Sequence, residues 1–241
     1  MELLKAILYT AQVRPYVILF LATFLFLSLR NRGVVRTLLF LILGYGIAFL
    51  SEYASIRTGF PYGLYHYIYP AMAGELIVGG VPGGVPIWDS LSYTFLAYTS
   101  FELTQFLRLK WPSFMAPLLM VAMDIVIDPV AARGDEWFLG KIYYYPEGGN
   151  YFGVPYSNFA GWFLVACAIH NSYFFIEKKL KPRMEPTHRQ IFLAGPLFYY
   201  GILAFNWGIT LWIGEWKLGL AGLVLHLPIF SALYRRRSWN S

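Results

Sequence analysis

Long apolar runs separated by short polar stretches make up most of the chain, and seven of these runs approach the length that crosses a bilayer as a helix. About 20 apolar residues are needed for one helical crossing. The seven predicted spans are 12–29, 34–55, 86–107, 112–132, 157–176, 190–213 and 216–234. A further stretch, 3–10, predicts either a short interfacial helix or an extension of the first span. The pattern therefore predicts an all-α fold, a polytopic transmembrane helical bundle of about seven spans.

The composition agrees with this pattern. Of the 241 residues, 58% are hydrophobic, 20% are aromatic and only 13% are charged, whereas a soluble domain has about 45–50% apolar and about 25% charged residues. So few charges leave too little polar surface for a soluble enzyme and argue against a disordered chain. The lone cysteine, Cys167, excludes an internal disulfide and indicates no zinc site. We expect residues 1–241 to form a single integral-membrane domain.

The basic residues predict the orientation of the bundle. The net charge is +6, and in a membrane protein such an excess indicates cytoplasmic loops, not a nucleic-acid partner. With seven spans, 13 of the 19 lysines and arginines fall on one side of the membrane. These are Arg30, Arg32, Arg36, Arg108, Lys110, Lys178, Lys179, Lys181, Arg183, Arg189, Arg235, Arg236 and Arg237. We therefore expect a multi-pass protein of the cell membrane with its N-terminus outside and its C-terminus in the cytoplasm.

Two of the predicted outer loops are long and rich in glycine, proline and tyrosine. They cover residues 59–85 and 133–156. Long loops of compact proteins are commonly functional or disordered, and their aromatic content favours packed lids at the membrane interface. A simple aromatic belt at the interface remains the alternative.

Four carboxylates lie inside the predicted spans, where an ionisable group costs several kcal/mol and usually marks a site or pathway. They are Glu52, Asp89, Asp124 and Asp128. The second and fourth spans run outward and the third runs inward, so all four carboxylates fall in the outer half of the membrane. They come from three different spans, and their convergence favours a functional site.

Asp124 and Asp128 are four residues apart and so project from one face of a helix. Pro129 follows and is expected to end or kink that helix. Two close carboxylates in a poorly hydrated site cannot both ionise at low cost, so one is expected to keep its proton at neutral pH and serve as a proton donor. Two other interpretations stay open. The aspartates are also able to bind Mg²⁺ for a diphosphate substrate, or to form a structural pair neutralised by Arg57 or Arg133.

Other polar residues in the spans are weaker candidates. Glu102 lies near the cytoplasmic end of the third span and is expected to extend its carboxylate toward water. His170 and His226 lie in spans without any metal-binding spacing, which favours hydrogen-bonded packing over ligation. Two asparagines in the outer half, Asn158 and Asn206, are placed either to orient water or to link helices by hydrogen bonds.

An acid cluster within an aromatic chamber suits the protonation of an isolated carbon–carbon double bond of a lipid. The resulting tertiary carbocation is stabilised by aromatic faces, and a second carboxylate can deliver water or remove a proton. No metal and no other cofactor is required for this chemistry. The aromatic residues expected to bind the substrate are Trp88, Tyr93, Trp137, Tyr144, Trp162 and Tyr65. Tyr143 and Tyr145 are further aromatic neighbours, and Tyr62, Tyr65 and His66 are expected to cap the chamber.

Three sequence runs resemble a known family. They are SEYASIRTGFPYGLYHY, PIWDSLSYTFLAY and MDIVIDPVAARGDEWFLGKIYYYPEGGNYFGVPYSNFAGW. They resemble the CruF-type carotenoid 1,2-hydratases, an integral-membrane family of carotenoid biosynthesis proteins, most strongly over residues 44–162. The resemblance implies addition of water across the terminal C1–C2 double bond of an acyclic carotenoid. It also implies a carotenoid substrate, the bilayer as surroundings, and other membrane enzymes of the pathway as candidate partners.

The roles of the acidic residues are inferred from their positions alone. Asp124 or Asp128 is expected to be the general acid, with Glu52 and Asp89 tuning it or positioning water. Two acids just beyond the fourth span are expected to be solvated loop charges, and two arginines are expected to hold the carboxylates in place. The acids are Asp135 and Glu136, and the arginines are Arg57 and Arg133.

Two alternatives from other functional classes remain. An intramembrane prenyltransferase also uses spaced aspartates, but here only the pair Asp124 and Asp128 is present, without the wider Asp-rich motif. Magnesium dependence would identify that class. A carotenoid-binding or proton-coupled transport protein also places carboxylates in its spans. Here the acids gather in one half of the bilayer, and dependence on a proton gradient would identify a transporter.

Overall fold

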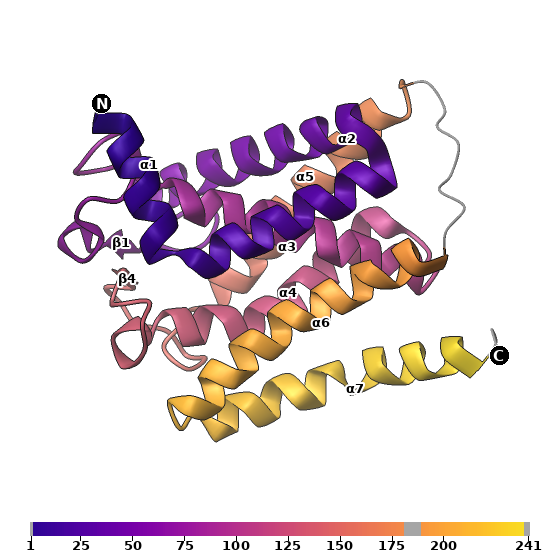
Figure 1. The fold of residues 1–241 in the computed structure, drawn as a ribbon. Helices are drawn as coiled ribbons and strands as arrows, with labels where there is room; N and C mark the ends of the chain where they lie inside the picture. The colour runs from indigo at the N-terminus through magenta and orange to yellow at the C-terminus, as the bar shows by residue number, and fades with distance from the viewer. Residues whose placement is uncertain (1, 181–188, 239–241) are drawn as a thin grey trace.

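The computed structural model describes residues 2–180 and 189–238, and within these ranges helices form most of the chain while the strands are only two residues long (Figure 1). The helices are α1 (Glu2–Val13), α2 (Pro15–Thr58), α3 (Ile87–Phe106), α4 (Pro112–Ala131), α5 (Tyr156–Glu177), α6 (Arg189–Trp212) and α7 (Trp216–Ser238). The predicted all-α class is therefore confirmed. The stretch 3–10 belongs to α1, a helix of its own that ends just before Arg14.

Helix α2 contains the first two predicted spans. It breaks at Gly33, whose φ of 79° and ψ of 172° are not helical, and a left-handed φ of this kind is readily adopted only by glycine. The chain reverses there, so the two arms of α2 run antiparallel (Figure 1). Ser28 and Thr37 join the arms by a hydroxyl pair of 2.8 Å, and the rings of Phe24 and Phe40 pack across them at 6.3 Å.

Four of the described helices, α2, α4, α5 and α7, are long and apolar enough to cross a membrane. Many large apolar side chains of these helices are exposed, for example Ile42, Leu50 and Val224, and such a surface requires a lipid environment. Helix α3 corresponds to the third predicted span but is not among the four. It is buried along nearly its whole length, so it packs against protein, not lipid, and can carry serine, threonine and tyrosine.

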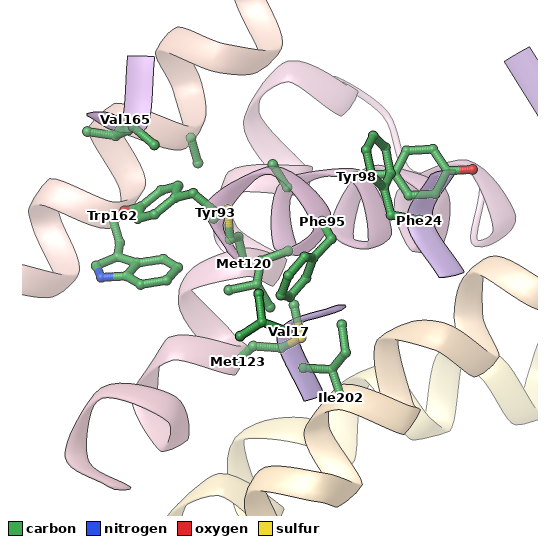
Figure 2. Close-up of a cluster of buried hydrophobic side chains, with 14 of the residues drawn as sticks. Val17, Phe24, Tyr93, Phe95, Tyr98, Met120, Met123, Trp162, Val165 and Ile202 are labelled. Atoms are coloured by element: carbon green, nitrogen blue, oxygen red, sulfur yellow. The ribbon is translucent and has the colours of Figure 1, made fainter. Parts of the chain in front are cut away.

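The core is built around α3. Figure 2 shows Tyr93, Phe95 and Tyr98 of this helix among side chains of α2, α4, α5 and α6. Tyr93 stacks on Trp162 of α5, with ring centroids 4.1 Å apart, and Tyr98 packs edge-on against Phe24 of α2 at 4.9 Å. Side chains from separate helices therefore fix the position of α3 on several sides.

The two long loops pack over one end of the bundle. Strand β1 (His66–Tyr67) pairs antiparallel with β4 (Tyr143–Tyr144), which joins one loop to the other (Figure 1). Strand β2 (Ile77–Val78) pairs with β3 (Val85–Pro86), and two short 3₁₀ helices, η1 (Tyr69–Met72) and η2 (Gly134–Glu136), complete the loops. Buried loop residues such as Met72 and Ile142 belong to the core. The loops are therefore packed lids, not a peripheral aromatic belt alone.

A buried ion pair lies at the opposite end of the bundle. Glu102 accepts hydrogen bonds from Arg32 at 2.9 and 2.5 Å and from Asn31 at 3.3 Å. Only 7% of Glu102 is exposed, so the expectation that its carboxylate extends to water is wrong. The guanidinium on the facing helix supplies the counter-charge that water would otherwise provide. Two residues of the predicted basic set, Lys181 and Arg183, lie outside the described residues.

Candidate functional site

Three of the four predicted carboxylates line one small polar cavity beneath the lids. Glu52 comes from the second arm of α2, Asp89 from the start of α3 and Asp128 from the last turn of α4. The cavity has a volume of about 50 Å³. Its other lining residues are Tyr62, Tyr65, Tyr93, Tyr143, Tyr145, Asn158 and Trp162. The acids that the sequence places on separate spans therefore meet in one place.

The fourth carboxylate, Asp124, is linked to Asp128 through an amide. Asn158 Nδ2 on α5 donates a hydrogen bond of 3.1 Å to Asp124 Oδ2 and a second hydrogen bond to Asp128 Oδ2. Asp124 is fully buried and is not part of the cavity lining. Helix α4 continues past Pro129 and ends at Ala131. Asp128 thus faces open space, whereas Asp124 supports it from behind.

Glu52 and Asp89 each accept a hydrogen bond from a hydroxyl. Ser90 Oγ donates to Glu52 Oε2 at 2.6 Å, and Tyr67 Oη donates to Asp89 Oδ2 at 2.5 Å. Burial, and to a smaller extent the nearby charge of Asp89, raises the pKa of the Tyr67 hydroxyl well above its usual value. Tyr67 therefore remains a neutral donor at physiological pH and holds Asp89 in one orientation.

A larger and mainly apolar cavity adjoins the polar one. Its volume is about 110 Å³, and it extends between α2, α3, α4 and α6. Asp89, Tyr93, Asp128, Tyr143 and Trp162 line both cavities and so form the wall between them. The apolar side is formed by rings and aliphatic side chains that include Tyr16, Phe20, Trp88, Phe95, Trp137 and Phe205.

The expectation that Arg57 or Arg133 neutralises the carboxylates is wrong. Arg57 donates to the carbonyl oxygens of Tyr53 and Gly83 at 2.8 and 2.7 Å and is exposed. Arg133 forms an ion pair of 2.7 Å with Glu215 and also binds two carbonyl oxygens. Arg57 lies in the last turn of α2 and Arg133 just beyond the end of α4, where unpaired carbonyl groups are abundant, and each guanidinium binds one helical and one loop carbonyl oxygen.

A buried ion pair near the apolar cavity was not anticipated from the sequence. Arg14 donates to both oxygens of Glu75 at 3.0 and 2.6 Å, and to the carbonyl oxygen of Leu139 at 2.7 Å. Glu75 also accepts a hydrogen bond of 2.6 Å from Trp88 Nε1. The available signal was that Glu75 is the lone acid of the loop 59–85 and sits among apolar residues.

The geometry of the β1–β4 pair corrects two predictions, namely that Tyr144 binds the substrate and that His66 caps the chamber. Tyr144 is 45% exposed and His66 is also exposed. The two face each other across the β1–β4 pair. Their strand neighbours Tyr67 and Tyr143 are buried instead, because successive residues of a strand point to opposite faces. Tyr144 and His66 therefore lie on the outer face of the lid, away from both cavities.

The remaining polar candidates behave mostly as structural residues. The histidine ring nitrogens contact carbonyl oxygens or a hydroxyl, with His170 Nδ1 2.7 Å from the Ala166 oxygen and His226 Nε2 3.2 Å from Tyr199 Oη. Their predicted packing role is confirmed. Asn206 donates to its own helix at 2.9 Å while lining the apolar cavity. The loop acids are exposed as expected, and Asp135 lies 3.5 Å from Lys141.

The described residues contain no cluster of three or more histidine, cysteine, aspartate or glutamate side chains with a metal-binding arrangement. Among the described residues, neither lysine nor arginine lines either cavity. The arrangement instead combines buried carboxylates, neutral hydroxyl donors and aromatic rings. These groups can move protons next to an apolar ligand.

Comparison with known proteins identifies the family of the chain. The sequence model of a family described as carotenoid biosynthesis protein matches residues 13–228. The chain is also 28% identical over 229 residues to bisanhydrobacterioruberin hydratase of Haloarcula japonica, an alignment that covers 87% of this chain and 70% of that protein. No solved structure matches the chain. Since the family match extends over most of the sequence, this protein belongs to the carotenoid biosynthesis protein family and has a carotenoid-modifying role in the membrane.

Proposed function

We propose that this protein is a carotenoid hydratase that adds water across the terminal C1–C2 double bond of an acyclic, ψ-end carotenoid. The product is a tertiary alcohol with its hydroxyl at C1. One observation carries the proposal: Asp89 and Asp128 line both an apolar cavity and a polar cavity. A hydratase must bring an alkene and water to the same acid, and these carboxylates have access to both spaces. The name of the relative from Haloarcula japonica supports the same reaction class.

The two cavities differ in the ligand that they suit. The apolar cavity is lined mostly by aromatic and aliphatic side chains, which favours a hydrocarbon end group. The polar cavity measures about 50 Å³, and since each water needs about 10–15 Å³ of such space, it has room for roughly three to five waters. The alkene and the water therefore have separate binding regions that meet at the carboxylates.

In the proposed mechanism, Asp128 is the general acid. Asp128 and Asp124 are close and share the amide of Asn158. Two such carboxylates are expected to hold one proton between them because joint ionisation in a buried site is costly. Asp128 transfers this proton to C2, and the π electrons form the new C–H bond. The positive charge then rests on C1, which carries two methyl groups and forms a tertiary cation.

Water then completes the reaction. Its oxygen forms the C1–O bond, and one of its protons passes to Glu52 or Asp89, which accept hydrogen bonds from Ser90 and Tyr67. The net change is the addition of one hydrogen and one hydroxyl group, and the accepted proton later returns to Asp128. The stacked rings of Tyr93 and Trp162 line both cavities and offer π faces that stabilise the cation.

The prenyltransferase alternative receives less support from the site. A diphosphate substrate needs basic side chains or a metal ion beside the aspartates. Among the described residues, the lining of both cavities contains neither lysine nor arginine, and the nearby Arg14 is already paired with Glu75. A diphosphate would therefore meet carboxylates without compensating charge.

A product assay tests the function. The protein is expressed in cells that accumulate lycopene, and the extracted pigments are analysed by mass spectrometry for a gain of one or two waters. We expect the adduct from the wild type and a loss of roughly 100-fold or more for Asp128→Asn, because general acid catalysis contributes about that much. Asp124→Asn should lose less activity, since Asp124 lies outside the cavity walls. Asp135→Asn, an exposed loop acid, is the matched control and should retain wild-type activity.

The outcomes separate the alternatives. An adduct that survives both Asp124→Asn and Asp128→Asn would move the acid to Glu52 or Asp89. Failure of the folded wild type to hydrate either lycopene or bisanhydrobacterioruberin would overturn the hydratase function. Magnesium-dependent chain transfer by the same preparation would replace it with prenyl transfer.

We also propose that residues 1–241 form one integral-membrane domain, with the N-terminus outside and the C-terminus in the cytoplasm. The distribution of lysine and arginine supports this orientation, and it places the lids and the carboxylates toward the outer surface. Fusion of a fluorescent protein and of alkaline phosphatase to the C-terminus provides the test. A fluorescent first fusion and an inactive second fusion are expected, and the reverse result would invert the orientation.

A further inference from the structure

Tyr93 lies at the junction of the two cavities, one helical turn after Asp89 on α3. Residues four apart on a helix share a face, and both side chains line the apolar and the polar cavity. The Tyr93 ring is fixed from two sides. It stacks on Trp162 with centroids 4.1 Å apart and meets Tyr62 at 6.0 Å. The position of the ring is therefore set mainly by packing.

The Tyr93 hydroxyl is buried and interacts with the neighbouring Tyr62 hydroxyl, but no protein group in residues 2–180 and 189–238 forms a hydrogen bond of good geometry with it. Only 3% of this residue is exposed. The Tyr62 hydroxyl on the same side is paired with Ser51 Oγ at 2.8 Å. Buried hydroxyls nearly always have a protein or water partner. We therefore expect a ligand or a water molecule to bind the Tyr93 hydroxyl.

The surroundings indicate which ligand it takes. The polar cavity beside Tyr93 contains the carboxylates of Glu52 and Asp89 and is large enough for water. A bound water needs two to four polar partners, and the phenol oxygen together with a carboxylate supplies two acceptors for its protons. The carotenoid itself is a hydrocarbon at its reacting end and has no group that needs a hydroxyl partner.

We propose that the Tyr93 hydroxyl holds the water molecule that captures the carbocation. This inference rests on the proposed hydratase function and assigns a water subsite within it. The phenol accepts a hydrogen bond from the water, so that a lone pair of the water oxygen points at C1. As the C1–O bond forms, the other proton of the water passes to Glu52 or Asp89. Without the hydroxyl, the cation still forms but water is poorly placed.

A cation that is not captured has a different fate. It loses a proton from C2, which restores the starting alkene, or from a neighbouring carbon, which gives a double-bond isomer. In D₂O the acid transfers a deuteron to C2, so recovered alkene keeps deuterium when the cation collapses by losing the original hydrogen of C2 or a hydrogen of a neighbouring methyl group. The ratio of hydrated product to deuterated alkene therefore measures water capture separately from protonation.

The test compares wild type with Tyr93→Phe in D₂O, using membranes supplied with lycopene and mass spectrometry of all carotenoids. Phenylalanine retains the ring that stacks on Trp162. We expect the ratio of hydrated product to deuterated alkene to fall about tenfold or more, while total deuterium uptake persists. Tyr98→Phe is the matched control. It removes another buried hydroxyl from the same helix, one whose partner is Asn31 at 3.4 Å and which lies away from both cavities, and should keep the wild-type ratio.

Each result has a distinct meaning. A wild-type ratio in Tyr93→Phe would overturn the water subsite and leave the hydratase function intact. A parallel loss of hydration and deuterium uptake would also overturn it, because Tyr93 would then act on substrate binding or protonation. Absence of both signals in the wild type would overturn the hydratase function itself, and the subsite with it.

Discussion

Arg14 and Glu75 form a buried ion pair in which Nη2 of the arginine lies 2.6 Å from Oε1 of the glutamate. The pair joins the start of α2 to the first lid. Arg14 also binds the carbonyl oxygen of Leu139 in the second lid, and Glu75 binds the indole of Trp88, which lines the apolar cavity. Two loops and two helices are therefore fixed at one point beside the cavity.

Removal of the charge on Glu75 should destabilise the protein substantially. Glu75→Gln leaves the Arg14 guanidinium buried without its counter-ion, and breaking a buried pair in this way costs about 3–5 kcal/mol. Unfolding of the purified protein in detergent by heat or denaturant measures this loss. Glu147→Gln removes the same charge from an exposed lid position and should change stability little. Equal stability of the two variants would contradict the prediction.

The hydrogen bond from Tyr67 to Asp89 should matter for catalysis. Tyr67→Phe removes a donor to a carboxylate, and such bonds contribute about 1.5–3 kcal/mol. If that contribution acts on the transition state, hydration should fall roughly 10- to 100-fold, since about 1.4 kcal/mol corresponds to a factor of ten. The rate of water-adduct formation in membranes measures this loss of activity. Tyr144→Phe, on the exposed face of the paired strand, should leave the rate unchanged. A loss in Tyr144→Phe would restore that residue to the site.

Much of the fold follows from the sequence because long apolar helices are governed by local composition. The run 34–55, for example, predicts the second arm of α2. The convergence of Glu52, Asp89 and Asp128 was predictable for a related reason: charges inside apolar spans are costly, and the alternating direction of the spans places them in one half of the bundle.

The contacts that hold the lids in place could not be predicted in the same way. Pairing of Arg14 with Glu75 joins residues 61 positions apart, and no local pattern indicates such a contact. The choice between Tyr143 and Tyr144 depends on strand register, and a shift of one residue exchanges the buried and exposed faces. Strands of two residues are too short to show an alternating pattern in the sequence.

The amide of Asn158 should be needed to hold the aspartate pair. Asn158→Leu keeps a similar volume but removes the donor to both Asp124 and Asp128. We expect hydration to fall by at least about tenfold, which corresponds to the loss of one hydrogen bond of about 1.4 kcal/mol in the transition state. Asn171→Leu is the matched control on α5, because its amide is exposed and binds the backbone carbonyl of Cys167. Equal activity of both variants would mean that the aspartates do not depend on the amide.

The ion pair at the far end of the bundle should affect stability without changing the chemistry. Glu102 lies away from both cavities and is paired with Arg32 at 2.5 Å. Glu102→Gln leaves a buried guanidinium without its counter-ion and should cost about 3–5 kcal/mol of unfolding free energy. Glu177→Gln breaks a more exposed pair with Arg36 and should cost less, because water solvates the remaining charge. Unfolding in detergent gives both values.

The activity of Glu102→Gln should not change. Protein of this variant that is folded should still form hydrated product at the wild-type rate, since the ion pair of Glu102 and Arg32 lies away from the carboxylates around Asp128. A change in the product distribution of this variant would instead show that the far end of the bundle takes part in binding the carotenoid.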